Sequence, residues 1–233
     1  MLFSRADVAG LIDACFEPVW EMVRTVPRVT IDFGNGRVVR RTLHGNIATY
    51  VCNSDGKVLD VLPGIYEPQA YMAQLTQFTY LAKYVKQAPS GQQAAKLSVY
   101  HEAQRAALAK NQPAPILINT AGISKRAIEE RIILAAMPAA RQRAALQRIT
   151  APPVHQEASQ LASWELLATD TRINETRRRL LIHAKLANGT MVAPAAITRW
   201  VYKDVLHTDL DDPYLGLGKL LFSAYPFEGD ELH

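Results

Sequence analysis

The one strong strand-like signal lies in a single stretch of the chain, between residues 29 and 62, and a short extended piece at 116–118 is left open. Short segments there alternate in polarity or are rich in β-branched residues, and turn sequences at 34–36, 44–46 and 54–56 separate them. Turns this short join antiparallel neighbours. From Pro63 onward the pattern is almost entirely helical. Because so little strand cannot build a barrel or a sandwich, the sequence predicts a predominantly helical α+β protein: a small antiparallel β-meander packed with helices, followed by an all-α body.

The N-terminal segment has the apolar spacing of an amphipathic helix. Apolar residues recur at steps of three and four from about Arg5 to Val26. Pro18 lies inside this segment, so we expect it to kink or divide the helix, and we expect Pro27 to end it. Cys15 falls in the middle of the segment, where a cysteine usually packs as a small buried hydrophobe.

Breaks in the pattern divide the chain into two parts. The Pro-Ser-Gly sequence at 89–91 ends the helix that begins near Pro68. Two consecutive prolines mark a possible linker near 150–154. We therefore expect residues 1–88 to form a first part and residues 89–233 to form a helical extension.

Composition narrows the class of protein. The chain has 233 residues, two cysteines and a formal charge of +4. Two cysteines rule out a disulfide scaffold, and no four-ligand zinc cluster is spelled out. A membrane span needs about 18 apolar residues in a row, and we expect none. The N-terminus lacks the features of a secretory signal, so we expect a cytoplasmic protein unless a signal sequence has been trimmed from it.

The second half of the strand region resembles a known family. A strand runs into an Asp-Gly-Lys hairpin at 55–57, a second strand ends at Gly64, and a helix follows. This order and spacing resemble the second half of a thioredoxin-like domain. The resemblance covers about residues 10 to 85, and it implies that the helix holding Cys15 matches the active-site helix of that family.

The positions of this chain that match the family lack the residues that carry out dithiol chemistry. The redox centre of the thioredoxin-like family is a C-x-x-C motif at a helix N-terminus, whereas Cys15 is followed by Phe16-Glu17-Pro18. Where the family has its cis-proline, this chain has Ile47. The resemblance therefore implies a degenerate thioredoxin-like protein that acts as a protein-interaction or scaffold module without dithiol chemistry.

Cys15 and His44 are the candidate catalytic residues. At a helix N-terminus the dipole would favour the Cys15 thiolate, and His44, in a loop close to the expected active-site edge, could act as its base. The alternatives are a buried packing cysteine and a solvated loop histidine. Cys52 is expected to pack in the core, and a Cys15–Cys52 disulfide is open in an oxidising compartment.

Metal-ligating residue types occur without a recognised spacing. His183 and His207 lie in helical context, and His207 together with Asp209 could bind a metal, but no H-E-x-x-H pattern is present. Carboxylates at 209, 211 and 212 alternate as in a calcium loop, yet the loop's glycine and later glutamate are missing. We therefore expect a turn here, and neither a metal ion nor a cofactor in the protein.

Charge is unevenly distributed along the chain. Residues 124–148 carry six basic and two acidic residues, residues 172–185 carry five and one, and residues 204–233 carry one and seven. The basic helices could bind nucleic-acid phosphates, or the acidic tail could fold back onto them. Arg177, Arg178 and Arg179 span too many faces of a helix to meet one partner.

Three functional hypotheses follow. The first is the degenerate thioredoxin-like interaction module, with an unidentified protein partner. The second is a single-cysteine thiol enzyme that uses Cys15. The third is a nucleic-acid-binding helical domain, which the lack of interleaved aromatic and basic residues makes unlikely. Apolar stripes on several helices would also allow a homodimer.

Overall fold

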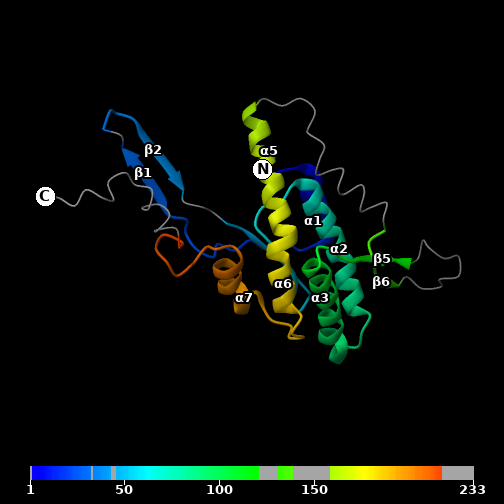
Figure 1. Cartoon of the computed structure of the whole chain (residues 1–233). Helices are drawn as coiled ribbons and strands as arrows, with labels where there is room; N and C mark the ends of the chain where they lie inside the picture. The colour runs from blue at the N-terminus through cyan, green and yellow to red at the C-terminus, as the bar shows by residue number, and fades with distance from the viewer. Residues whose placement is uncertain (1, 33, 43–45, 121–130, 139–157, 217–233) are drawn as a thin grey trace.

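The computed structural model describes residues 2–32, 34–42, 46–120, 131–138 and 158–216 (Figure 1). In chain order its helices and strands are α1 (Ala6–Cys15), β1 (Arg28–Asp32), β2 (Val38–Thr42), β3 (Ala48–Cys52), β4 (Val58–Pro63), α2 (Pro68–Lys86), η1 (Ser90–Gln92), α3 (Gln93–Ala109), β5 (Ile116–Asn119), β6 (Ile132–Ala135), α5 (Ala158–Ile173), η3 (Asn174–Arg178), α6 (Arg179–Leu186), α7 (Pro194–Trp200) and η4 (Val201–Val205).

The fold is α+β and rich in helix, which confirms the predicted class. The strands form three antiparallel pairs, β1–β2, β3–β4 and β5–β6, each a separate two-stranded sheet. Among the described residues the strands of the first part are therefore two hairpins rather than one continuous meander. The β1–β2 hairpin projects from the helical body (Figure 1). The second part is not purely helical either, because β5 pairs with β6.

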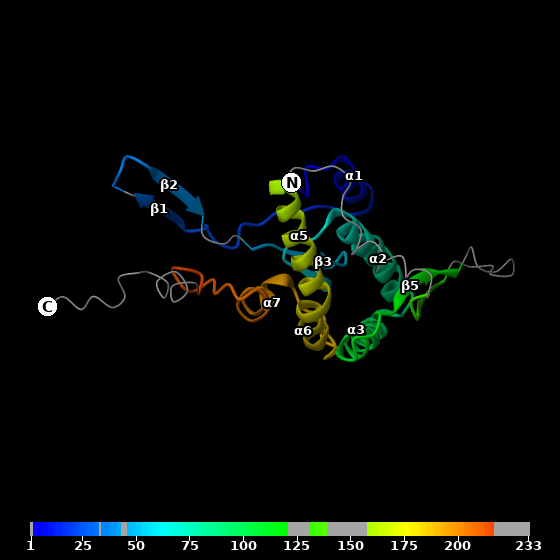
Figure 2. The ribbon, with the colours of Figure 1, turned by 45° about the horizontal axis from the view of Figure 1, so that its top comes forward.

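Strand β4 lies at the centre of the helical body. It pairs with β3 and is contacted by α2, α6 and η3, and all six of its residues are buried. Figure 2 shows α2 on one side of this hairpin and the α5–α6 helix on the other. Gly56, in the predicted turn before β4, has a φ of +68°, a backbone conformation that favours glycine.

Two apolar cores meet at β4. The first joins α1, α2, α3, β5 and β6 to Leu59 and Leu62 of β4. The second joins α6, α7 and η4 to Val58 and Val61 of the same strand. Both cores combine residues from before and after position 88, so in the described residues the two parts share their interior. The division at 88 stays a prediction.

The N-terminal helix is shorter than the apolar spacing predicts. Helix α1 ends at Cys15, and Phe16 is already extended, with φ −138° and ψ 157°. The chain from 16 to 27 contains neither helix nor strand. Pro18 supplies the reason, because a proline removes a helical N–H donor and disfavours helical geometry in the residue before it. The expected helix up to Val26 is therefore wrong.

The helices α5, η3 and α6 form one continuous rod. The turn η3 is π-helical and lies between two α-helical stretches. A π turn accommodates one extra residue per turn, so it shifts which side chains face the core.

Within the described residues, no helix combines the length and the apolar character that crossing a membrane requires.

Candidate functional site

The two predicted catalytic residues are not brought together in the described structure. Cys15 is a free, exposed thiol and the last residue of α1. The N–H groups that stabilise a thiolate are therefore at the opposite end of its helix. The expected burial of Cys15 is wrong, because the helix ends there and turns the side chain out of the core. His44 lies outside the described residues.

Cys52 lies on β3 as a half-buried free thiol that packs against the second core. Burial raises the pKa of this thiol, which disfavours the reactive thiolate. The predicted packing role is confirmed. Neither thiol forms a disulfide in the structure.

The aspartates near the C-terminal end of the described chain form a turn. The side chain of Asp209 accepts from the amide N–H of Asp211, and that of Asp212 accepts from the amides of Tyr214 and Gly216. Asp209 also lies 2.7 Å from the ammonium of Lys203. These carboxylates serve their own backbone and a neighbouring helix, as a turn requires.

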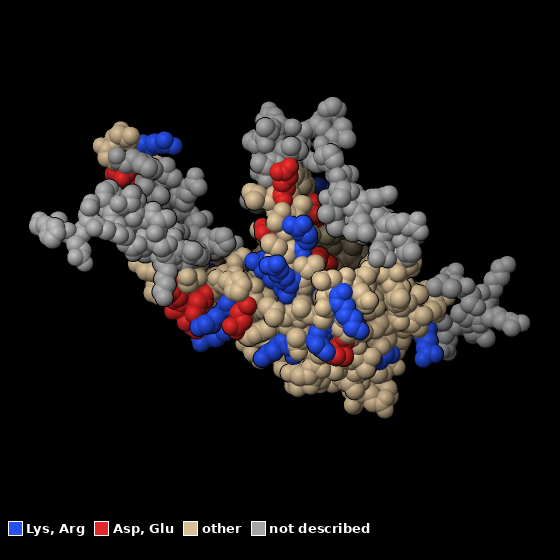
Figure 3. Space-filling view, in the orientation of Figure 1, with Lys and Arg blue, Asp and Glu red and all other residues tan. Residues whose placement is uncertain are grey.

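The arginine triplet divides over three environments, as predicted. Arg177 is exposed, Arg178 donates to the Asn174 side chain at 2.7 Å, and Arg179 is buried. Figure 3 shows the Lys and Arg side chains gathered over the α5–α6 helix, with acidic residues beside them. Because Arg179 is buried, this basic surface is weaker than the sequence count of residues 172–185 suggests.

The densest polar arrangement is a buried cluster of five residues from three elements. We call it the β4 cluster: Asp60, Tyr100, His101, Arg179 and His183. Strand β4 supplies the aspartate, α3 supplies the tyrosine and one histidine, and α6 supplies the arginine and the other histidine. Each is at most 3% exposed. Polar groups this deep are stable only when they are hydrogen-bonded.

Asp60 is the anion of the β4 cluster. Its Oδ1 accepts from Nη1 of Arg179 at 2.8 Å and from the amide of Val61 at 2.7 Å. Its Oδ2 accepts from the hydroxyl of Tyr100 at 3.2 Å. Burial is the largest single influence and would lower the pKa of Arg179, but the combined electrostatic effect of Asp60, Tyr100, Tyr66 and Glu175 holds that pKa above its usual value.

The β4 cluster also covers the edge of β4 that faces away from β3. The carbonyl of Leu59 accepts from Nε2 of His101 at 3.0 Å, and the carbonyl of Val61 accepts from Arg179 at 3.0 Å. An uncovered strand edge would leave these buried carbonyls unpaired or open to another strand. The side chains of α3 and α6 therefore take the place that a further strand would occupy.

The hydrogen-bond partners of the ring nitrogens determine the tautomers of the two histidines. A carbonyl only accepts, so His101 carries its hydrogen on Nε2, and its Nδ1 accepts from Nδ1–H of His183 at 2.9 Å. Nε2 of His183 is then a bare lone pair, buried and without a partner. Burial lowers the pKa of His101 to about 4 and that of His183 well below its usual value, so both rings are neutral at pH 7.

Gly64 and Asn174 allow the end of β4 to pack closely against η3. Gly64 follows β4 with φ +82°, and a Cβ there would lie 2.9 Å from the side chain of Asn174. Asn174 donates to the carbonyl of Ile65 at 2.7 Å, which explains why the π turn η3 approaches the backbone so closely. Nearby Glu175 accepts from Gln74, and burial raises the pKa of Glu175.

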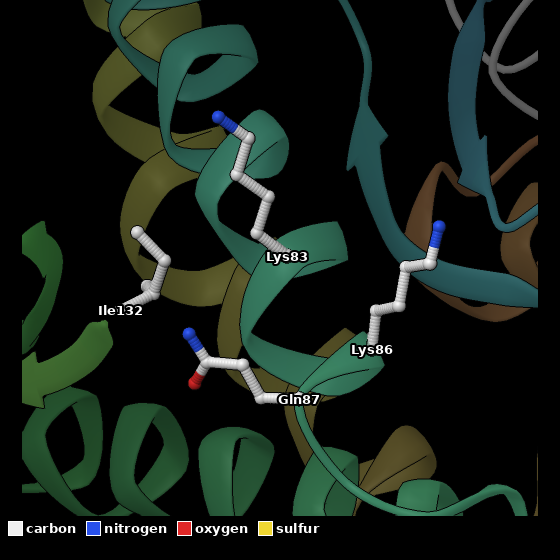
Figure 4. Close-up of a pocket in the computed structure, with 4 residues that line it drawn as sticks. All are labelled: Lys83, Lys86, Gln87 and Ile132. Carbon is white, nitrogen blue, oxygen red and sulfur yellow. The ribbon is translucent and has the colours of Figure 1, made fainter. Parts of the chain in front are cut away.

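The shallow hollow in Figure 4 does not form an anion site. It measures about 250 Å³ and is lined by Lys83, Lys86, Gln87 and Ile132. The two ammonium groups point apart rather than toward a common centre (Figure 4). Two cations that do not converge cannot grip one anion jointly.

The most unusual surface is a run of exposed apolar side chains. We call residues 19–23 the apolar segment: Val19 is 89% exposed, Trp20 77%, Met22 60% and Val23 39%. A tryptophan is rarely left this bare, because burying an aromatic ring is strongly favourable. Glu17 and Glu21 are exposed within or beside this segment.

Both ends of the apolar segment are anchored. On one side Phe16 packs against the first core. On the other side Nη1 of Arg24 donates to the carbonyl of Leu210 at 2.7 Å and to the carbonyl of Asp212. The segment is therefore held between two fixed points while its apolar side chains face outward.

The sequence gives signals for part of this arrangement. Asp60 is a lone carboxylate between Val-Leu and Val-Leu pairs, and such a carboxylate needs a buried partner. Nothing local identifies Arg179 as that partner, because the two residues are 119 positions apart.

Comparison of the chain with protein-family models, with curated proteins and with solved structures gave no match.

Proposed function

We propose that the protein is a protein-interaction module, built on a degenerate thioredoxin-like part and working without dithiol chemistry. The observation that carries the proposal is the apolar segment, held between two anchors with Val19, Trp20 and Met22 exposed. Large exposed apolar residues that lie together mark interaction surfaces, and tryptophan is the residue most enriched among their energetic centres.

The chemistry of the segment describes the partner. Its centre is an aromatic ring that needs an apolar cleft, and Glu17 and Glu21 place negative charge at its rim. A protein with an apolar cleft bordered by Lys or Arg fits both properties. Because the chain from 16 to 27 is neither helix nor strand, the partner binds it as a presented loop.

Site-specific photo-crosslinking tests the proposal. A photoreactive residue replaces Trp20 in one variant and Val99, which is 59% exposed on α3, in the matched control. We expect the position-20 variant to form one reproducible crosslink to a protein of the source cells, and the Val99 control not to form it. Identical crosslinks from both positions, or none from position 20, contradict the proposal.

A second copy of the chain is the other occupant that the experiment must separate. Sedimentation velocity of the purified protein and of Trp20→Ser does so. Under the proposal the wild type sediments as a monomer, and the variant sediments identically. A wild-type dimer that Trp20→Ser dissociates replaces the heterologous partner with a homodimer.

The exposure of Cys15 favours one further candidate, a single-cysteine thiol enzyme. A catalytic thiol reacts with iodoacetamide well below the pH at which an ordinary thiol, with its pKa near 8.5, begins to react. The interaction module predicts an ordinary rate profile for Cys15. Fast alkylation near neutral pH in the folded protein favours the enzyme instead.

A further inference from the structure

The β4 cluster contains three side chains of the types that bind divalent ions. Asp60, His101 and His183 each offer one ligand atom within 4.8 Å of the other two, and all three are buried. One carboxylate and two imidazoles form a donor set typical of zinc-class ions. The two histidines are 82 positions apart and no local motif joins them, so the sequence gives no signal of this site.

The two imidazoles are close to the spacing that one ion requires. Their Nδ1 atoms lie 2.9 Å apart with a single hydrogen between them. Two Zn–N bonds of tetrahedral geometry would place the nitrogens about 3.3 Å apart, so the rings need to separate by only about 0.4 Å. The hydrogen on Nδ1 of His183 would move to Nε2 of the same ring, which holds a lone pair without a partner. The bond from Nε2 of His101 to the Leu59 carbonyl is the outer contact that orients metal-ligating histidines.

Asp60 keeps acceptor capacity beside the rings. Its Oδ1 already accepts from Arg179 and Val61, whereas Oδ2 accepts one bond, at 3.2 Å, from Tyr100 among the described residues. A carboxylate oxygen has two lone pairs, so Oδ2 can accept an ion without breaking the pair with Arg179.

We propose that Asp60, His101 and His183 bind one divalent ion of the zinc class. Three protein ligands leave a fourth position on the ion open. Because all three ligands are buried, we assign the ion a structural role. It enters while α3 and α6 close on β4, and it ties these three elements together. This site is separate from the apolar segment, so its failure would leave the proposed interaction function untouched.

The first test measures zinc in the full chain, purified without a histidine tag. The protein is unfolded in guanidinium with a chelator and refolded with and without ZnCl₂. We expect about one zinc per chain after refolding with zinc, and a higher midpoint of thermal unfolding than in the zinc-free sample. Substoichiometric zinc together with identical midpoints overturns the proposal.

The second test assigns the ion to its ligands. His183→Gln removes a ligand, and His207→Gln removes an exposed histidine as the matched control. We expect zinc affinity to fall in His183→Gln by more than the about 10–100-fold that outer contacts are worth, and to be unchanged in His207→Gln. Loss of zinc in the control alone overturns the site.

Histidine NMR of the wild type decides the question if His183→Gln does not fold. Zinc removal should then shift the imidazole signals of His101 and His183 and leave that of His207 in place. A zinc-dependent shift confined to His207 overturns the proposal, and unchanged signals of His101 and His183 overturn it equally.

Discussion

The β4 cluster and the apolar segment invert the usual distribution of side chains. In the cluster, charged Asp60 and Arg179 are buried at a separation of 2.8 Å. In the segment, Val19 and Trp20 are left in water. The buried polar groups are nearly all paired and serve the fold, whereas the described chain leaves most of the surface of these apolar side chains uncovered. An exposed apolar surface such as the apolar segment is therefore the place to look for partner binding, because its burial would be favourable and the fold does not supply it.

The largest expected effect is loss of the buried ion pair. Arg179→Met leaves the Asp60 carboxylate buried without its cation, and we expect the free energy of unfolding to fall by about 3–5 kcal/mol. Arg177→Met, at an exposed neighbour, should change it by less than about 0.5 kcal/mol. Urea unfolding followed by circular dichroism measures both.

A double variant distinguishes the effect of an unpaired buried charge from a general loss of folding. Asp60→Leu combined with Arg179→Met removes both charges, and it should be more stable than Arg179→Met alone because no charge stays buried. Equal stability of Arg179→Met and Arg177→Met would show that the ion pair does not hold β4 to α6.

Acidification should weaken the β4 cluster next most strongly. In the zinc-free protein, burial lowers the pKa of His101 from 6.5 to about 4. Between these pH values the unfolded chain binds more protons than the folded chain, so stability is full above about pH 6.5 and falls with pH by up to about 3 kcal/mol. The raised pKa of Glu175 acts in the opposite sense, because the protein gains stability when this carboxyl is protonated.

A histidine variant separates these two contributions. The fall in unfolding free energy between about pH 7 and pH 4 should be shallower in His101→Gln than in the wild type. The exposed His207 offers the control, and His207→Gln should keep the wild-type slope. Parallel slopes for wild type and His101→Gln contradict the assignment of the pH dependence to the buried ring.

Substitution of Gly64 tests the close approach of η3 to the end of β4, and we expect a smaller effect on stability. Gly64→Ala places a Cβ 2.9 Å from the side chain of Asn174 at a φ of +82°, and we expect a loss of about 1–3 kcal/mol. Gly10 lies in α1 with nothing within 4 Å of a Cβ, so Gly10→Ala should stabilise by about 0.5–1 kcal/mol. Differential scanning calorimetry compares the two, and a shared sign would refute the described geometry at Gly64.

Local features could be predicted from the sequence, and long-range ones could not. The hairpin turns and the helix from Pro68 follow from residues that act on their immediate neighbours. The apolar spacing does not indicate the end of α1, because it continues through Pro18, a residue that removes a donor the helix needs. Asp60 and Arg179 meet through tertiary packing, which no local pattern encodes.

The candidate site shows the same division. The family resemblance points to Cys15 and His44, yet the exposed apolar surface begins just after Cys15. Trp20 and Val23 belong to the apolar spacing that predicts a helix as far as Val26, but α1 ends at Cys15 and both side chains are exposed. The signal was present in Phe16-Glu17-Pro18, a sequence that disfavours helix.

We propose that the apolar segment recognises a partner while the β4 cluster maintains the fold. Measuring partner affinity and unfolding free energy in the same Trp20→Ser protein tests it most directly, with the crosslinked protein as partner. We predict that affinity falls by about 30-fold or more while the free energy of unfolding changes by less than about 0.5 kcal/mol. Unchanged affinity, or a loss of affinity matched by a loss of stability, would contradict the claim.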